Sequence, residues 1–425
     1  MKTIPNKFLL PALFAILTFA GFQIARDANE YPEKLIWSDM EGYYVYLPAT
    51  FIYGGFENVA VRDTGYLRRW ENSGKIYTKY TCGVALMQTP FFLGAHALSA
   101  PLGYPSDGHS EIYPLALLLG AVVYMLLGMW LLYLSLRRYF SLWASVLTLA
   151  ALLLGTNLYY YSFFQSAMSH VYSFFLFAAL VCLTERLLEG LQSTRRQWTT
   201  WALLGLVAGL IVLVRPTGII VLLYPLYRCW KALPAKMPYL RAQAGPVLLA
   251  GLMFVLPWIP QFLYWKYMSG DWVMWSYKDE SFKYWKEPKL FRVLFDAWNG
   301  WLLYSPIAII PLVALLLGRH SNRFGERGLL LIFAIATYLF ASWWAWWFGG
   351  AFGHRSYVEY YALLAIPFAL VAEKALRRWY TALPFVALCA LLCYYSLGLT
   401  YNYRAPWDGA DWTYERVWQE VDKLF

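Results

Sequence analysis

Long apolar runs restrict the fold of this chain more than any other feature. A helix needs about 20 apolar residues to cross the hydrocarbon core of a bilayer. Hydrophobic residues are 60% of the chain and charged residues only 14%, whereas soluble domains carry about 25% charged residues. We therefore predict an all-α integral membrane protein with about eleven transmembrane helices. The apolar runs lie near residues 8–25, 112–136, 142–158, 167–184, 199–214, 217–227, 245–265, 300–318, 328–346, 358–372 and 381–398.

The basic residues predict how these helices are threaded through the membrane. If the N-terminus is cytoplasmic, the inner segments carry 17 Lys and Arg and four acidic residues, and the outer segments carry 18 basic and 21 acidic residues. Because Lys and Arg collect on the cytoplasmic side, this distribution favours a cytoplasmic N-terminus. It also accounts for the net charge of +10 without a nucleic-acid partner. The first run follows Lys2 and Lys7 and lacks an A-x-A cleavage site, which favours an uncleaved helix over a signal peptide.

This threading places the long loops on the outer face. The loops cover residues 26–111 and 266–299, and a tail follows at 399–425, so the chain divides into a polytopic domain (1–398) and this tail. Apolar stretches at 46–55 and 84–103 in the first loop are typical of helices that lie in the membrane interface. Long loops commonly carry functional sites, so we expect the function at the outer face. The five scattered cysteines show neither metal-type spacing nor a disulfide framework.

Two carboxylates stand close together at the start of the first outer loop, in WSDMEGYYVYLP (37–48). Asp39 and Glu41 would point to opposite faces of a strand, or about 200° apart around a helix. They are poorly placed to share one proton, and could bind one divalent ion only in a loop conformation. We expect Asp39 to do chemistry, keep Glu41 as a catalytic or metal-binding candidate, and keep solvated loop charges as the alternative. Tyr43 and Tyr44 are candidate pocket residues.

Ionisable residues close to membrane depth form a second group of candidates. Arg215 lies in LVRPTGII, between two apolar runs. The alternative there is an arginine that reaches to the outer headgroups. His170 lies in FFQSAMSHVYSFF, at the outer start of an apolar run. Its alternative is a hydrogen-bonded structural histidine.

The stretch WWAWWFGGAFGHRSYVEYY (343–361) contains the densest group of candidates. Its glycines permit unusual turns or close backbone approach. An arginine offers a planar fork suited to phosphate oxygens, and tryptophan faces suit sugar rings and lipid tails. The candidates are Trp347, His354, Arg355 and Glu359. The alternative is an interfacial aromatic belt with an anchoring arginine.

Taken in order along the chain, these segments resemble the GT-C class of integral membrane glycosyltransferases. WSDMEGYYVYLP is similar to the first-loop motif of the bacterial branch that includes aminoarabinose and protein-mannosyl type transferases. VRPTG, FDAWNGWLLYSP and WWFGGAFGHRS look like segments of further bacterial members. The resemblance covers most of the chain. It implies inverting transfer of a sugar from a polyprenyl-phosphate-linked donor to an acceptor, at the periplasmic face of the bacterial inner membrane.

The resemblance also implies roles for individual residues. Its first-loop carboxylate is the general base that takes the proton of the acceptor hydroxyl, and Asp39 matches it. Cations must neutralise the lipid phosphate as it leaves, and we take Arg215, His354 and Arg355 as candidates. Where the family has an adjacent Asp-Glu pair, Met40 intervenes here, so a role for Glu41 stays open. No cofactor is firmly indicated, and a divalent metal is a candidate.

The expected partners are a lipid-linked sugar donor and a membrane lipid, glycan or protein acceptor. Two other classes of function compete with glycosyl transfer. A transporter or flippase of lipid-linked or anionic substrates would need ionisable residues in mid-span and matching broken helices in two repeats. The charges instead stand at the outer ends of the runs, and no such repeat is visible. A non-catalytic membrane scaffold is the remaining alternative.

Overall fold

The protein is mostly α-helical. The computed structural model describes residues 9–59, 67–69, 74–190, 196–232, 241–277, 280–320 and 322–425. Lys2, Lys7, Arg195 and Lys236, which belong to the predicted inner set of basic residues, lie outside this part. The long helices are α1 (Leu9–Ala28), α5 (Ile112–Leu136), α6 (Leu142–Leu154), α8 (Ser169–Glu189), α9 (Trp198–Val214), α10 (Leu223–Ala232), α12 (Ala244–Val255), α13 (Ile259–Ser269), α16 (Ile309–Gly318), α17 (Glu326–Ser342), α18 (Tyr361–Ala375) and α19 (Trp379–Asn402).

Shorter elements connect the long helices. The remaining α-helices are α4 (Gly83–Ser99), which has 17 residues, and the short helices α2 (Asp39–Tyr44), α3 (Tyr46–Phe51), α7 (Leu158–Phe163), α14 (Leu290–Phe295), α15 (Trp301–Tyr304) and α20 (Tyr414–Asp422). The 3-10 helices are η1 (Pro32–Lys34), η2 (Ala100–Leu102), η3 (Pro216–Leu222), η4 (Leu256–Trp258), η5 (Pro306–Ala308) and η6 (Arg355–Tyr357). Strands β1 (Arg68–Arg69) and β2 (Ile76–Tyr77) pair antiparallel, Arg68 opposite Tyr77.

The helical fold expected from the apolar runs is confirmed, and the number of spans remains a prediction. Within the described residues, four helical segments are long and apolar enough to cross a membrane: Ile112–Leu136, Ser169–Glu189, Ala244–Ser269 and Trp379–Asn402. Several runs are interrupted. The run at 300–318 contains α15, η5 and α16, and the helix predicted from 358 begins at Tyr361, which leaves Glu359 in the turn before it. The stretches at 46–55 and 84–103 do form helices, α3 and α4.

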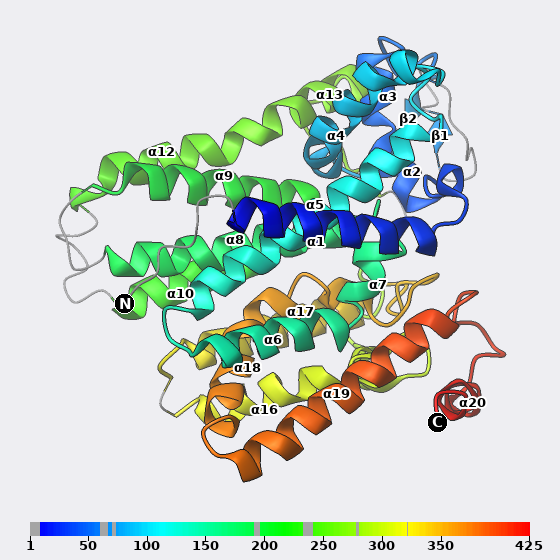
Figure 1. The fold of residues 1–425 in the computed structure, drawn as a ribbon. Helices are drawn as coiled ribbons and strands as arrows, with labels where there is room; N and C mark the ends of the chain where they lie inside the picture. The colour runs from blue at the N-terminus through cyan, green and yellow to red at the C-terminus, as the bar shows by residue number, and fades with distance from the viewer. Residues whose placement is uncertain are drawn as a thin grey trace.

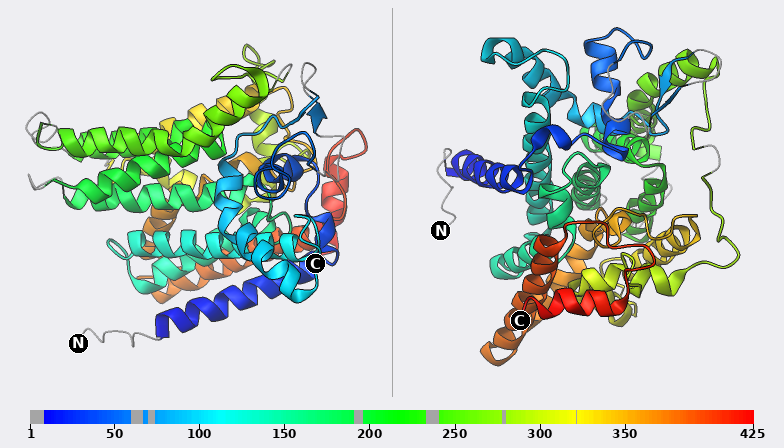
Figure 2. Two further views of the ribbon diagram at one scale, coloured as in Figure 1. Left: turned by 90° about the horizontal axis from the view of Figure 1, so that it is seen from above. Right: turned by 90° about the vertical axis from the view of Figure 1, so that its right-hand side faces the viewer.

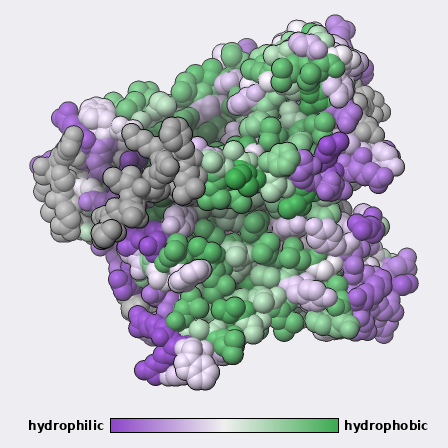
Figure 3. Space-filling view, in the orientation of Figure 1, coloured by the Kyte–Doolittle hydropathy of each residue, from purple (hydrophilic) through white to green (hydrophobic). Residues whose placement is uncertain are grey.

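The helices run roughly side by side between two ends of the molecule (Figure 1). The turns from α5 to α6, from α16 to α17 and from α18 to α19 lie at the left end in this view. Helices α2, α3, α4, α7 and α20 and the small sheet lie at the right end. Figure 3 shows a hydrophobic band between two more hydrophilic ends. The segments that the threading assigns to the same side of a membrane therefore lie at the same end of the molecule. We call the end that carries α2 and α4 the loop end.

Helix α8 lies in the centre of the bundle and packs against α5, α9, α10 and α18. Helix α1 lies at the edge, where it contacts α5 and α7 (Figure 2). Glycines bring α9 against α12, because a Cβ on Gly205 or Gly209 would come within 2.2 Å of a backbone carbonyl oxygen of α12. Such small residues let neighbouring spanning helices approach closely. This packing fixes α9, whose loop end carries Arg215.

Candidate active site

A cavity of about 600 Å³ opens at the loop end of the bundle. Its lining comes from α2, the segment 79–81, the start of α8, the break between α9 and η3, the second outer loop and the segment 339–355. Six of the residues proposed from the sequence line it: Asp39, Tyr43, His170, Arg215, Trp347 and Arg355. The fold thus gathers candidates that are far apart in sequence.

Both carboxylate oxygens of Asp39 have partners. Arg355 Nη2 lies 3.0 Å from Oδ2, and the Tyr80 hydroxyl donates a hydrogen bond to Oδ1. Burial alone would raise the pKa of Asp39, but Arg355, the Tyr80 hydroxyl and Lys79 outweigh it and hold this pKa below its ordinary value. The side chain of Asp39 is 19% exposed. Asp39 is therefore a deprotonated carboxylate at neutral pH that still reaches the cavity.

Tyr80 was not among the residues proposed from the sequence, and Gly42 explains its position. A Cβ at Gly42 would lie 2.5 Å from the Tyr80 ring, so only glycine lets the ring pack on α2. Thr78 Oγ1 donates to the Gly42 carbonyl oxygen over 2.7 Å, which ties this segment to α2. The rings of Tyr80 and Tyr43 are 4.3 Å apart. The position of Tyr80 depends on contact between two separate segments, which no local pattern reports.

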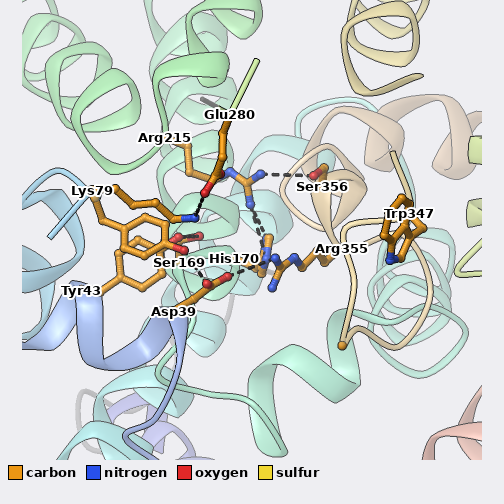
Figure 4. Close-up of polar contacts among 12 residues, drawn as sticks. Asp39, Tyr43, Lys79, Ser169, His170, Arg215, Glu280, Trp347, Arg355 and Ser356 are labelled. Carbon is orange, nitrogen blue, oxygen red and sulfur yellow. Dashed lines mark hydrogen bonds and ion pairs between the residues drawn. The ribbon is translucent and has the colours of Figure 1, made fainter. Parts of the chain in front are cut away.

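Three side chains from two other segments of the chain hold Arg215 (Figure 4). Its Nε lies 3.3 Å from Glu359 Oε1, its Nη1 donates to His170 Nδ1 over 2.9 Å, and its Nη2 donates to Ser356 Oγ over 3.2 Å. A guanidinium carries five N–H donors, so these contacts leave two donors for a ligand. Arg215 follows the last residue of α9 and has an extended backbone, and Pro216 opens η3. This break in the helix turns the arginine into the cavity.

A further ion pair stands on the wall formed by the outer loops. Lys79 Nζ lies 2.5 Å from Glu280 Oε1, and both residues line the cavity (Figure 4). Ser276 Oγ donates to the Lys79 carbonyl oxygen over 2.6 Å, so the second outer loop is attached to the first. From its sequence, the lysine-rich stretch 275–289 of the second loop could attract an anionic substrate or be a solvated loop of mixed charge. Lys79 and Glu280 offered no signal beyond lying in a polar stretch of an outer loop.

His354 does not line the cavity, unlike its neighbour Arg355. Its side chain is buried, and because a carbonyl only accepts, Nε2–H donates to the Trp346 carbonyl oxygen over 2.9 Å. Burial lowers the pKa of His354 to about 3, so the ring is neutral at physiological pH. His354 is absent from the cavity lining and lies buried in the turn that carries Arg355, so its phosphate-binding role stays a prediction.

Other proposed residues also lie behind the cavity wall. Glu41 is buried in α2 and does not line the cavity. Tyr44 is buried, and its hydroxyl donates a hydrogen bond to the Gly108 carbonyl oxygen. This bond joins two distant parts of the first outer loop. Glu359 is buried beside Arg215 and His170, with Oε2 3.3 Å from His170 Nδ1. Burial raises the pKa of Glu359 to about 7, although Arg215 opposes this rise. Glu359 therefore supports the cavity from behind.

Glycines in the segment 343–361 shape the turn between Trp347 and Arg355. Gly350 and Gly353 adopt φ values of 59° and 61°, which side chains rarely permit. The amide of Gly350 donates to Asp408 Oδ2 over 3.1 Å, so the tail is attached to this turn. Gly353 also packs close to Asn157 and Tyr304. The turn brings a tryptophan and an arginine eight positions apart to the same cavity.

The residues present do not fit a metal ion held by the protein. Among the described residues, no group of three or more His, Cys, Asp and Glu could hold one. Asp39 is already engaged by Arg355 and Tyr80, and Glu280 by Lys79. Divalent cations need several oxygen ligands, and these carboxylates would first have to leave their partners. No step is therefore derived through a metal.

No family model matches this chain, and no curated protein does. Among solved structures it is similar to the archaeal oligosaccharyltransferase AglB from Archaeoglobus fulgidus in complex with an inhibitory peptide and a dolichol-phosphate, with 15% identity and a TM-score of 0.48 over 91% of this chain and 55% of that chain. The complex of the Archaeoglobus fulgidus oligosaccharyltransferase with Zn and sulfate gives 15% identity, a TM-score of 0.47, and coverage of 90% and 52%. The chain spans about half the length of these structures.

Proposed function

We propose that this protein is a glycosyltransferase of the GT-C type that moves a hexosyl or pentosyl residue from a polyprenyl-phosphate-linked donor to an acceptor hydroxyl, with inversion. One observation carries the proposal: the cavity joins a deprotonated carboxylate, Asp39, to two arginines within a largely apolar lining. A base, a cationic site for a leaving phosphate and an apolar place for a lipid tail are the three parts that this reaction requires.

The transfer needs one proton acceptor and one leaving group. The acceptor oxygen attacks the anomeric carbon and forms the new glycosidic bond while the bond from that carbon to the phosphate oxygen breaks. The bonding pair leaves with the polyprenyl phosphate, whose added negative charge is neutralised by Arg215 and Arg355. The proton of the acceptor hydroxyl passes to a carboxylate oxygen of Asp39. Attack opposite the leaving phosphate inverts the configuration.

The Asp39–Arg355 ion pair makes the basicity of Asp39 depend on whether the donor is bound. While the two side chains lie 3.0 Å apart, Arg355 helps to keep the Asp39 pKa low, and such a carboxylate is a weak base. A phosphate competes for the guanidinium of Arg355 because both offer anionic oxygens to the same fork. When Arg355 turns to the phosphate, burial raises the Asp39 pKa and the carboxylate becomes a stronger base. Donor binding thus activates Asp39.

The aliphatic part of the cavity supports a lipid-linked donor. Val214, Pro216 and Ile219 line it on the side of η3, and Leu339 lines it on the side of α17, next to the ring of Phe340. Ile219 is 56% exposed, so this lining continues onto the outside of the apolar band. A polyprenyl chain gains about 0.8 kcal/mol for each CH₂ that it buries. The tail would lie here with the phosphate at Arg215 and Arg355.

The proposal places the active face outside the cytoplasm, in a bacterial inner membrane. Its support is the distribution of basic residues in the sequence, because the loops that form the cavity belong to the acidic side of the predicted threading. Cys82 is the one cysteine in a predicted outer loop, and its thiol is buried. Labelling this thiol from outside the cell, in a variant that exposes it, tests the orientation. Labelling from the cytoplasmic side alone would contradict it.

Mass spectrometry of surface glycans, lipids and glycoproteins tests the reaction. Cells without the protein should lack a sugar modification that the wild-type gene restores and the Asp39→Asn variant does not. The variant must reach the membrane at the wild-type level. Equal restoration by Asp39→Asn would rule out the proposed base, and identical profiles with and without the protein would rule out the proposed function.

A further inference from the structure

Aromatic rings follow one another along the cavity wall, starting at Asp39. Tyr80 donates to Asp39, and its ring lies 4.3 Å from Tyr43 and 6.3 Å from Tyr277. The Tyr277 ring lies 6.0 Å from Trp275 and 6.1 Å from Trp343, and the Trp343 ring lies 5.0 Å from Phe282. All of these rings line the cavity. We call them the aromatic wall: Tyr43, Tyr80, Trp275, Tyr277, Phe282 and Trp343.

Hydrogen bonds between the outer segments fix the aromatic wall before any ligand arrives. The Tyr284 amide donates to the Ser342 carbonyl oxygen over 3.0 Å, and the Trp344 amide donates to the Ser281 carbonyl oxygen over 3.1 Å. These bonds attach the second outer loop to the segment after α17, just as Ser276 attaches it to the first loop. A preformed wall loses little conformational freedom when a ligand binds.

The chemistry of the aromatic wall differs from that of the aliphatic part. Prenyl chains have no flat polar edge and pack well on the side chains of Val214, Ile219 and Leu339. A sugar ring has one face of C–H bonds, which suits the negative face of an aromatic ring, and a rim of hydroxyls. The Lys79–Glu280 pair stands within this wall, with Lys79 Nζ 5.7 Å from the Tyr277 ring centre. Charged donors and acceptors of both signs can bind that rim of hydroxyls.

We propose that the acceptor is itself a saccharide, bound along the aromatic wall with one of its hydroxyls at Asp39. This inference rests on the proposed function and names the class of acceptor. The wall begins at the base, so its occupant is the molecule that gives up a proton. The donor phosphate and tail occupy Arg215, Arg355 and the aliphatic part instead. The product is therefore a sugar joined to another sugar.

Trp343 gives the sharpest test of the stacking surface. Leucine keeps an apolar side chain but removes the flat face, whereas phenylalanine keeps a flat face. If the sugar gains as much from the ring face as a second aromatic ring does, about 0.5–1.5 kcal/mol, Trp343→Leu should lower the amount of product by about two- to tenfold. Trp343→Phe should stay near the wild type. Trp379→Leu, at the other end of the molecule and exposed, is the matched control and should have no effect.

Glycosidic linkage analysis of the product decides the class of acceptor. The analysis uses cells that lack the gene and are complemented with the wild type, Trp343→Leu, Trp343→Phe, Trp379→Leu or Asp39→Asn. All variants must be present in the membrane at equal levels. We expect a protein-dependent sugar linked to another sugar, with the order of variants given above. A sugar linked directly to an amino-acid side chain or to a non-saccharide lipid headgroup would overturn the inference and leave the proposed function standing, and so would equal product from Trp343→Leu and Trp343→Phe. Loss of any protein-dependent sugar difference would instead overturn the proposed function.

Discussion

Two clusters of similar chemistry, each made of an arginine, a carboxylate and tyrosine, lie at opposite ends of the described part of the molecule. At the end opposite the cavity, Arg228 of α10 holds Glu185 of α8 through contacts of 2.7 and 3.0 Å. The Tyr224 hydroxyl donates to the same carboxylate over 3.1 Å, and the Tyr139 hydroxyl over 2.5 Å. At the loop end, Arg355 and Tyr80 hold Asp39 in the same manner. Both clusters therefore combine a carboxylate, an arginine and a tyrosine.

Access separates the two clusters. Glu185 is fully buried, and its arginine is 9% exposed, so this cluster joins helices and meets no ligand. The Asp39 and Arg355 side chains are 19% and 18% exposed and line a cavity. A closed ion pair stabilises only the fold that contains it, whereas one that lines a cavity can exchange its partner for a substrate. Variants at the two ends should therefore fail in different ways.

The largest expected effect is on the reaction. Asp39→Asn removes the base but keeps the shape and the hydrogen bond from Tyr80, so the rate of transfer should fall by about 10²–10⁴-fold, the usual contribution of general base catalysis. Thermal unfolding in detergent should stay close to that of the wild type. A variant that unfolds early would show that Asp39, like Glu185, mainly holds the fold together.

The opposite result is expected for Glu185→Gln. This change leaves Arg228 buried without its counter-charge, so the free energy of unfolding should fall by about 3–5 kcal/mol. Thermal or denaturant unfolding of the purified protein measures this loss. Glu189→Gln, one turn further along α8 and 63% exposed beside Arg138, is the matched control and should cost less than about 1 kcal/mol. Equal losses would contradict the structural role of the closed cluster.

Arg355→Ala should weaken donor binding. A hydrogen bond to a charged group contributes about 1.5–3 kcal/mol, so the dissociation constant for a polyprenyl phosphate should rise by about 10- to 150-fold. Binding to purified protein in detergent can be followed by quenching of tryptophan fluorescence. Arg404→Ala removes an exposed arginine of the tail and should change nothing. Equal effects of the two substitutions would argue against a phosphate at Arg355.

The last prediction concerns the pH dependence of stability through Glu359, which shows only when stability is compared across several pH values. Its pKa is about 7 in the folded protein and about 4.3 in an unfolded chain, so the folded state binds more protons between these values. Stability contributed by this group is present at pH 4 and is lost as the pH rises to 7. Glu359→Gln should abolish this pH-dependent loss of stability, which is at most about 4 kcal/mol. Unfolding curves from pH 4.5 to 7.5 measure it, and parallel curves for variant and wild type would refute it.

Sequence reasoning located the helices and several cavity residues for physical reasons that can be stated. Apolar runs report helices directly, and a charge beside such a run is costly enough to indicate a role, as for Arg215. Asp39 and Arg355 were proposed separately, but their contact was not, because it depends on tertiary packing. His354 and Arg355 are adjacent, but Arg355 lines the cavity and His354 does not. Tyr80 was missed because its place depends on Gly42, a residue that looked unremarkable in its loop.

Each arginine and lysine of the cavity is paired with a carboxylate, and this pairing affects how well the site discriminates against free anions. Asp39, Glu359 and Glu280 already stand beside Arg355, Arg215 and Lys79. Inorganic phosphate would have to displace these carboxylates through its charge alone, because it has no apolar part to bury. A lipid-linked phosphate brings the same oxygens together with a buried tail, which adds about 0.8 kcal/mol for each CH₂. The site should therefore ignore the phosphate dissolved around it and respond to a phosphate presented by the membrane.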